Sequence, residues 1–220
     1  VSRLRKLVNN KISQRFIGDL YNLNPELSFY FYKIYLNQLI KDIKKIGINI
    51  NTVPVLDVLR DNTHDIIVNR SYSNNPKIVK LLGDFCIKEY HSNKLGTVIK
   101  HIPGHGCASE DSHFKLPKVF FSQKELNDRD FLPYKSSKSF FAMTAHVLYK
   151  KLDKNNPATF SKKIITSIIR RKIGFNGILI SDDISMKALK YDLLTNAKKS
   201  LSAGCNLVLY CAGKLKDSSK

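Results

Sequence analysis

Short apolar segments alternate with amphipathic segments along almost the whole chain, and this alternation limits the fold more than any other feature of the sequence. Five segments rich in β-branched and aromatic residues are predicted strands: 48–58, 97–102, 140–147, 177–181 and 206–211. Apolar residues at helical spacing precede or separate them: 25–46, 76–90, 122–135, 161–173 and 185–203. Strands that alternate with helices form a parallel sheet, and near-continuous apolar strands indicate burial on both faces. We therefore predict an α/β fold.

Polar residues that can bind ligands or do chemistry gather at the carboxyl-terminal ends of the predicted strands. They are Asp57, Lys100, His101, His146, Asp182 and Asp183. In a (β/α) barrel this end of the strands carries the active site. A closed barrel needs eight strand–helix units, and only five are visible. We expect residues 1–220 to form a single catalytic domain, an incomplete (β/α)8 TIM barrel without its N-terminal strands.

The formal net charge of +19 raises the question of a polyanionic partner. Lys and Arg number 37 against 18 Asp and Glu, and such a field attracts nucleic acid, anionic membranes or acidic substrates. The basic residues are scattered over every predicted helix and form no long basic block. We therefore expect no nucleic-acid partner, and keep a basic nucleic-acid-binding protein as an alternative. No run of about 18 apolar residues exists, so no transmembrane helix and no membrane partner are expected.

The segment KHIPGHG, residues 100–106, is the densest motif. Lys100 and His101 end a predicted strand, and a rigid Pro-Gly turn follows. Burying a lysine and a histidine together is costly without partners, so the pair suits binding of hydroxyl or carbonyl groups.

The segment DSH follows closely, with Asp111 two residues before His113. A carboxylate that binds one imidazole nitrogen raises the basicity of the other, so His113 is a candidate general acid/base. Taken from the residues alone, Glu110 or Asp111 is the alternative acid.

Adjacent carboxylates, Asp182 and Asp183, end the strand GILI. One of them can face the barrel mouth and attack a carbon centre, and the other can cap the backbone of the next helix. Arg70, in a polar loop, offers a rigid fork of donors for sugar hydroxyls or an amide carbonyl. Asp57 either binds ligand or orients a neighbour, and His146 either lines the pocket or is a hydrogen-bonded core histidine.

A metal-dependent barrel hydrolase is a second enzyme class that the residues allow. Its zinc ligands would be His101, His105, His113 and Asp182. No strand carries an HxH pair, and Lys100 would place a positive charge beside the metal. We therefore expect no metal and no other cofactor.

Seven motifs together resemble the β-N-acetylhexosaminidases of glycoside hydrolase family 3, the NagZ type. They occur in the family's order from Val53 to Cys211: VPVLDV, NRSYSNNP, KHIPGHG, DSH, MTAHVLY, GFNGILISDDISM and AGCNLVLYC. The departures are apolar: Ile102 stands where Phe is usual, and Val53 where Ala is common. By the family's layout the five predicted strands are the last five of the barrel. The missing strands would leave sheet edges exposed, so we expect residues 1–220 alone to be inactive or poorly folded.

The resemblance implies a retaining mechanism with Asp182 as nucleophile and His113 as acid/base, tuned by Asp111. It also implies that Arg70, Lys100, His101 and Arg3 hold the sugar hydroxyls and the N-acetyl group. The expected activity is that of an exo-β-N-acetylglucosaminidase that releases N-acetylglucosamine from anhydro-muropeptides during cell-wall recycling. A cytoplasmic monomer that binds such a muropeptide or glycoside is expected.

Overall fold

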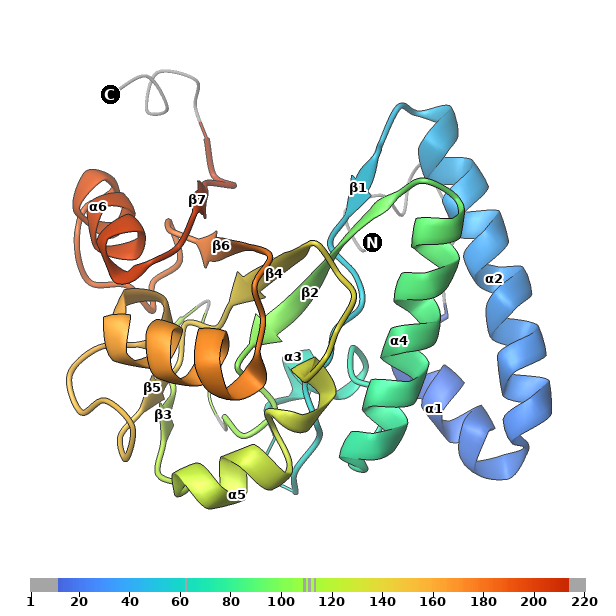
Figure 1. The fold of residues 1–220 in the computed structure, drawn as a ribbon, viewed down its shortest axis with the longest axis horizontal. Coiled ribbons are helices and arrows are strands. Elements are labelled where there is room, and N and C mark those ends of the chain that lie inside the picture. Colours follow the sequence, from blue (N-terminus) through green and yellow to red (C-terminus); the bar gives the residue numbers. More distant parts are fainter. Residues whose placement is uncertain (1–11, 62, 109, 111, 113, 214–220) are drawn as a thin grey trace.

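A computed structural model describes residues 12–61, 63–108, 110, 112 and 114–213. Its centre is a curled sheet of five parallel strands in the order β1-β2-β4-β6-β7 (Figure 1). The strands are β1 Ile50–Asn51, β2 Gly96–Ile102, β4 Phe141–Thr144, β6 Ile178–Asp183 and β7 Leu207–Leu209. A two-stranded parallel sheet joins β3 Lys118–Val119 to β5 Leu148–Tyr149. All five predicted strands are present, in chain order and parallel, which confirms the predicted α/β class.

The first strand is shorter than predicted. Only β1 is regular, and the chain returns to the sheet further on, where Val55 bridges Lys100 and the Leu56 N–H donates to the Lys100 carbonyl at 2.7 Å. Pro54 interrupts the ladder because proline has no N–H to donate. This second pairing places Asp57, the next residue, beside His101 at the end of β2.

The strand register shifts where the polar residues lie. The β2–β4 pairing shifts between Lys100 and Ile102, and the β6–β7 pairing shifts between Ile180 and Asp183. Such irregularities re-aim side chains at the rim of a barrel. At the ends of β2 and β6, successive side chains therefore no longer alternate strictly between the two faces of the sheet.

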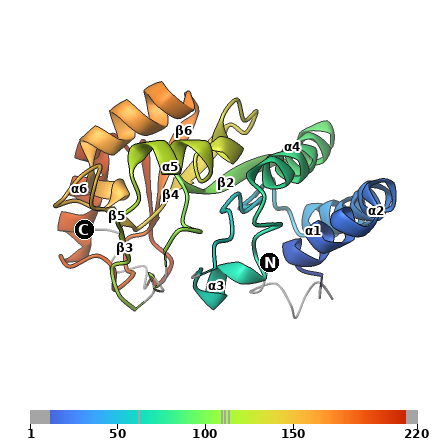
Figure 2. The same cartoon turned by 90° about the horizontal axis from the view of Figure 1, so that it is seen from below.

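The helices cover the two flanks of the sheet, as Figures 1 and 2 show. On the flank of β1 and β2, α4 lies next to the sheet, and α1 and α2 lie outside it. The helical segments are α1 Gln14–Leu23, α2 Pro25–Lys45, α3 Asp65–Val68, α4 Pro76–Ser92, α5 Gln123–Asp128, η2 Leu132–Tyr134, η3 Ala158–Phe160, the π-helix η4 Ile164–Ile173 and α6 Leu193–Ala203. None of the helices described is both long and apolar enough to cross a membrane.

Local signals explain where most helices begin and end. The Asn75 side chain accepts from the Lys77 N–H at 2.9 Å and Pro76 follows at the first helical position, so α4 begins at the first residue of the predicted helix 76–90. The prediction of a helix over 185–203 is wrong in its first part, because Asp192 caps the helix and α6 begins only at Leu193. The predicted helix over 122–135 is also too long: α5 ends at Asp128, and a short 3-10 turn with Pro133 follows. The helix α1 was not predicted.

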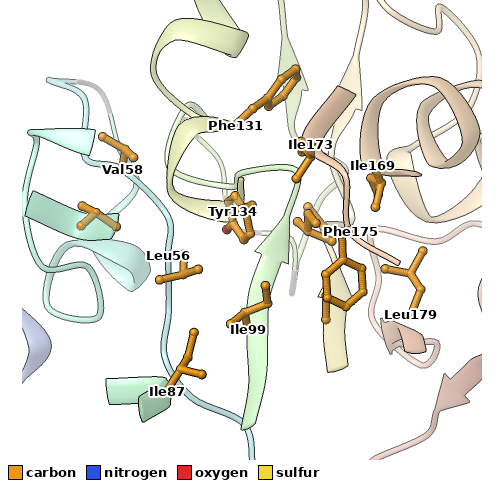
Figure 3. Packing of buried hydrophobic residues seen from close by; sticks show 14 of the residues in the cluster. Leu56, Val58, Ile87, Ile99, Phe131, Tyr134, Ile169, Ile173, Phe175 and Leu179 are labelled. Carbon is orange, nitrogen blue, oxygen red and sulfur yellow. The ribbon is translucent and has the colours of Figure 1, made fainter. Parts of the chain in front are cut away.

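One hydrophobic core joins the sheet to its covering helices. Figure 3 shows Leu56, Ile99 and Tyr134 near one another, with Ile169 of η4 and Leu179 of β6 further to the right in the same cluster. All five side chains are buried. Burial of strand and helix side chains in one cluster fixes the strand ends relative to one another, which is what the site needs.

Candidate active site

Asp57 is the centre of the polar cluster at the strand ends. It is fully buried and accepts four hydrogen bonds from described residues. Its Oδ1 accepts from the backbone N–H groups of His101 (3.2 Å) and His105 (2.6 Å) and from the Tyr134 hydroxyl (3.0 Å). Its Oδ2 lies 2.7 Å from His101 Nδ1. A carboxylate so enclosed orients its neighbours, the second of the two roles considered for it.

The charge of Asp57 follows from these partners. Burial alone raises a carboxyl pKa, but the His101 charge and hydrogen bond, together with His105, hold the pKa of Asp57 well below its usual range. Asp57 is therefore an anion fixed inside the protein, and it fixes the His101 ring by Nδ1.

The other nitrogen of His101 points to the end of β6. His101 Nε2 lies 3.9 Å from Asp182 Oδ2, and the Asp182 side chain is 15% exposed. Burial opposes ionisation of Asp182, but the nearby His101 and Lys100 and the Asp183 N–H, which donates to Asp182 Oδ1 at 2.8 Å, lower its pKa. Asp182 is thus an ionised carboxylate that a ligand can reach, the state that a nucleophile requires.

Asp183 turns the other way. Its Oδ1 accepts from the Ser185 N–H (3.0 Å), the Ser185 hydroxyl (2.7 Å) and the Cys211 N–H (3.2 Å). The two adjacent acids therefore divide their tasks, with Asp183 tying the loop after β6 to the end of β7. No helix starts at Asp183, since α6 is capped by Asp192.

His146 lies beneath Asp183 and is fully buried. Its Nδ1 is 2.7 Å from the Thr159 hydroxyl, and its Nε2 is 3.1 Å from the Asp183 carbonyl oxygen. Burial lowers the pKa of His146, so the ring is neutral near pH 7. Of the two roles considered for it, the geometry is that of a hydrogen-bonded core histidine that supports the loop after β6.

Lys100 adds a cation beside these acids. Its Nζ lies 3.2 Å from the Thr52 hydroxyl, and the side chain is half-buried. Burial and the nearby Arg70 guanidinium lower the pKa of Lys100 to about 8, although Asp182 and Asp57 act in the opposite direction. Lys100 and Arg70 thus approach one another at the same end of the sheet as Asp182. Two neighbouring cations suit a ligand that is rich in acceptor oxygens.

These placements can be compared with known proteins. A family model described as the glycosyl hydrolase family 3 N-terminal domain matches residues 23–219. The chain belongs to glycosyl hydrolase family 3. Its parallel curled sheet, with helices on both flanks, is the partial (β/α) barrel that the sequence predicted.

Family 3 relatives of this chain carry related names. A β-hexosaminidase from Nitrosomonas eutropha is 31% identical over 216 residues, 96% of this chain and 62% of that protein. NagZ from Neisseria gonorrhoeae, in complex with N-trifluoroacetyl-D-glucosamine, superposes with a TM-score of 0.82 at 30% identity, over 90% of this chain and 58% of that one. LpqI from M. tuberculosis gives a TM-score of 0.84 at 26% identity, over 96% and 62%. These findings confirm the resemblance to the NagZ type, and the chain spans 62% of the N. eutropha relative.

Three predicted family 3 site residues, Arg3, Asp111 and His113, lie outside the described residues. The two residues that flank Asp111, Glu110 and Ser112, are described. Glu110, the alternative acid, pairs with Lys115 at 2.5 Å, and the Ser112 hydroxyl lies 3.2 Å from His105 Nε2. The Glu110 carboxylate is therefore already engaged with a lysine.

The metal-site alternative is not assembled in this family 3 chain as far as it is described. Within those residues, no group of three His, Cys, Asp or Glu side chains is placed to hold a metal ion. His101 Nδ1 is engaged with Asp57, and His105 Nε2 with Ser112.

Sequence reasoning missed two members of the cluster. Tyr134 reaches Asp57 from the short η2 turn, and Thr159 holds His146 from η3. Both lie in irregular segments without a motif, so composition and periodicity carry no signal for them. Only the hydrogen-bonding demand of a buried carboxylate and a buried imidazole could have suggested that such partners exist.

Proposed function

We propose that the protein carrying this chain is a retaining exo-β-N-acetylglucosaminidase. The observation that carries the proposal is Asp182, an ionised and reachable carboxylate at the end of β6 with Lys100 and His101 beside it, in a family 3 chain. Relatives named β-hexosaminidase, and a NagZ bound to an N-acylated glucosamine, support the choice of sugar.

The proposed reaction has two steps. An Asp182 carboxylate oxygen forms a bond to the anomeric carbon while the glycosidic C–O bond breaks, and His113 gives its proton to the departing oxygen. Water then attacks the same carbon, the bond to Asp182 breaks, and His113 takes a proton from the water. Most retaining glycosidases use two carboxylates, and here an imidazole tuned by Asp111 takes the acid/base role.

Four basic residues, Lys100, Arg70, Arg3 and His101, bind the sugar. Lys100, with a pKa of about 8, is mostly protonated near neutral pH and donates to acceptor oxygens. Arg70 and Arg3 add guanidinium donors for the hydroxyls and the N-acetyl carbonyl. His101, locked by Asp57, lies where it can touch the sugar and Asp182 together.

The natural substrate that we propose is the N-acetylglucosaminyl-anhydro-muropeptide of cell-wall recycling, cleaved in the cytoplasm by a monomer. Family resemblance supports this part of the proposal. A fluorinated N-acetylglucosamine derivative that traps the covalent intermediate is the direct test. Mass spectrometry of the labelled protein should place the sugar on Asp182, and a label on Asp183 or no turnover of nitrophenyl N-acetyl-β-glucosaminide would overturn the proposal.

A further inference from the structure

His105 has no part in the proposed reaction, yet it is among the most enclosed residues at the strand ends. The side chain is buried, and its ring lies edge-on to the His101 ring with centroids 5.6 Å apart. Its backbone N–H donates to Asp57 Oδ1 at 2.6 Å, and its Nε2 lies 3.2 Å from the hydroxyl of buried Ser112. The buried imidazole thus has one side-chain hydrogen-bond partner among the described residues, and that partner is Ser112.

Ser112 is the residue between Asp111 and His113. We propose that His105 is a positioning residue that holds, through the Ser112 hydroxyl, the chain segment bearing the acid/base pair. This inference rests on the proposed function, in which His113 protonates the leaving group.

The backbone on both sides of His105 is anchored, so the residue can serve as a fixed base. The Gly104 carbonyl accepts from the Tyr149 hydroxyl at 2.5 Å, and the Gly106 carbonyl accepts from the Thr63 hydroxyl at 2.6 Å. A Cβ added to Gly106 would lie 1.9 Å from the Val58 carbonyl oxygen, so the loop is pressed against that segment. A side chain on such a support locates its partner well.

The same anchor serves both halves of the proposed reaction. Asp57 binds the His101 ring, which faces Asp182, and it also binds the His105 backbone, which leads to Ser112. One buried carboxylate thereby fixes His101 and His105 relative to each other. Their spacing matters to the proposed reaction, because a misplacement of a catalytic group by about 1 Å can cost on the order of a hundredfold in rate.

The chemistry of the ring suits this role. Burial and the nearby His101 lower the pKa of His105 to about 4, so the ring is neutral near pH 7. A neutral imidazole has one donor and one acceptor nitrogen and can pair with a hydroxyl in either sense. It offers no proton of its own that would compete with His113.

The test compares leaving groups, using the protein as its organism makes it. For each variant, kcat/KM is measured with dinitrophenyl N-acetyl-β-glucosaminide, whose departure needs no acid, and with a methyl or muropeptide glycoside, whose departure needs His113. Ser112→Ala and His105→Asn should lose roughly a hundredfold on the poor leaving group and about threefold or less on dinitrophenol. A general fault in folding would lower both values equally.

Two matched variants sharpen the result. In His105→Gln the amide reaches the position of Nε2 and should restore most of the lost kcat/KM, whereas the shorter Asn should not. Ser28→Ala removes another buried serine hydroxyl, one that donates to the Ile17 carbonyl at 3.0 Å far from the site, and should leave both substrates unaffected.

The outcomes separate the two proposals. If the unmodified protein cleaves both substrates and the variants lose equally on both, the positioning role of His105 is wrong and the proposed function stands. If the unmodified protein cleaves neither, the proposed function fails and this inference fails with it.

Discussion

Asp57 and Asp130 are both fully buried carboxylates beside the KHIPGHG loop, but they are held in opposite ways. Both oxygens of Asp57 are hydrogen-bonded, and its pKa is lowered. Asp130 has one close partner, Arg60, at 2.6 Å, while its Oδ1 has no hydrogen bond from any described residue, and burial raises its pKa. Burial alone therefore does not decide whether the pKa of a carboxyl group is raised or lowered here. The number and kind of hydrogen-bond donors around it decide the direction.

The difference follows from the position of each acid. Asp57 lies at the end of a strand segment, where the backbone N–H groups of His101 in β2 and His105 in the following loop both donate to it. Asp130 follows α5 and packs its Cβ 3.0 Å from where a Cβ on Gly104 would stand, so it fills space behind the loop. Its partner Arg60 lies over the Phe121 ring at 4.0 Å and is 19% exposed. We infer that Asp57 serves the site and Asp130 serves the packing of the loop.

The largest expected effect comes from neutralising each acid without changing its shape. Asp57→Asn should destabilise the fold by about 3–5 kcal/mol, because it removes the charged partner of buried His101. It should also abolish most activity. Asp130→Asn should cost about 1–3 kcal/mol, because Arg60 can turn to water and one oxygen is unpaired already. Urea unfolding beside kcat/KM checks both, and equal losses in the two variants would erase the distinction.

Asp57 and Asp130 should change the pH dependence of the unfolding free energy in acid in opposite directions. A lowered pKa makes Asp57 stabilising above its unfolded pKa of about 4, and that stability is lost as the pH falls towards the lower folded pKa. The raised pKa of Asp130 acts oppositely, since protonation as the pH falls towards about 4 favours the folded state. Asp57→Asn should therefore flatten the loss of stability in acid, and Asp130→Asn should steepen it. Unfolding free energies between roughly pH 6 and 3 measure the slopes, and the same slope in both variants would contradict the assigned charges.

A smaller effect concerns Lys100, whose pKa is lowered to about 8 by burial and the Arg70 guanidinium, while the charges of Asp182 and Asp57 keep it from falling further. Deprotonation above that pH removes a donor to the sugar, so KM should rise several-fold on the alkaline side. Asp57→Asn should move this rise to lower pH, and Asp130→Asn should leave it in place. Any residual activity of the Asp57 variant suffices for the measurement, since KM does not depend on the amount of active enzyme. An alkaline KM limb that no variant moves would show that Lys100 does not bind substrate.

The strands, and the polar residues at their carboxyl-terminal ends, could be predicted from the sequence for physical reasons. Buried parallel strands need continuous apolar runs, and a charged residue that ends such a run has few structural explanations. The two adjacent acids Asp182 and Asp183 were recognised in this way, although their division of tasks came from geometry.

What the sequence could not predict depends on contacts between distant segments. Tyr134 lies 77 positions from Asp57, and its segment follows the early end of α5 at Asp128. The residues just before α6 also favour a helix, but hydrogen bonds in the loop after β6 hold them in turns. Asp192 then caps α6, and the helix begins only at Leu193. Such choices are made by tertiary packing and hydrogen-bond demand, which leave no local period to read.

The smallest effect tests whether the donors of Asp57 act singly or together. Tyr134→Phe removes only the 3.0 Å hydroxyl contact to Oδ1, where two backbone N–H groups remain as donors. The expected cost is about 1 kcal/mol, and kcat/KM should stay within a few-fold. Tyr90→Phe is the matched control, since it removes a buried hydroxyl that accepts from the Asn51 side-chain amide at 2.8 Å and leaves Asp57 untouched. If Tyr134→Phe instead removed as much activity as Asp57→Asn, the Tyr134 hydroxyl alone would stabilise the Asp57 charge. The difference between Asp57 and Asp130 would then come from this one donor and not from the number of donors.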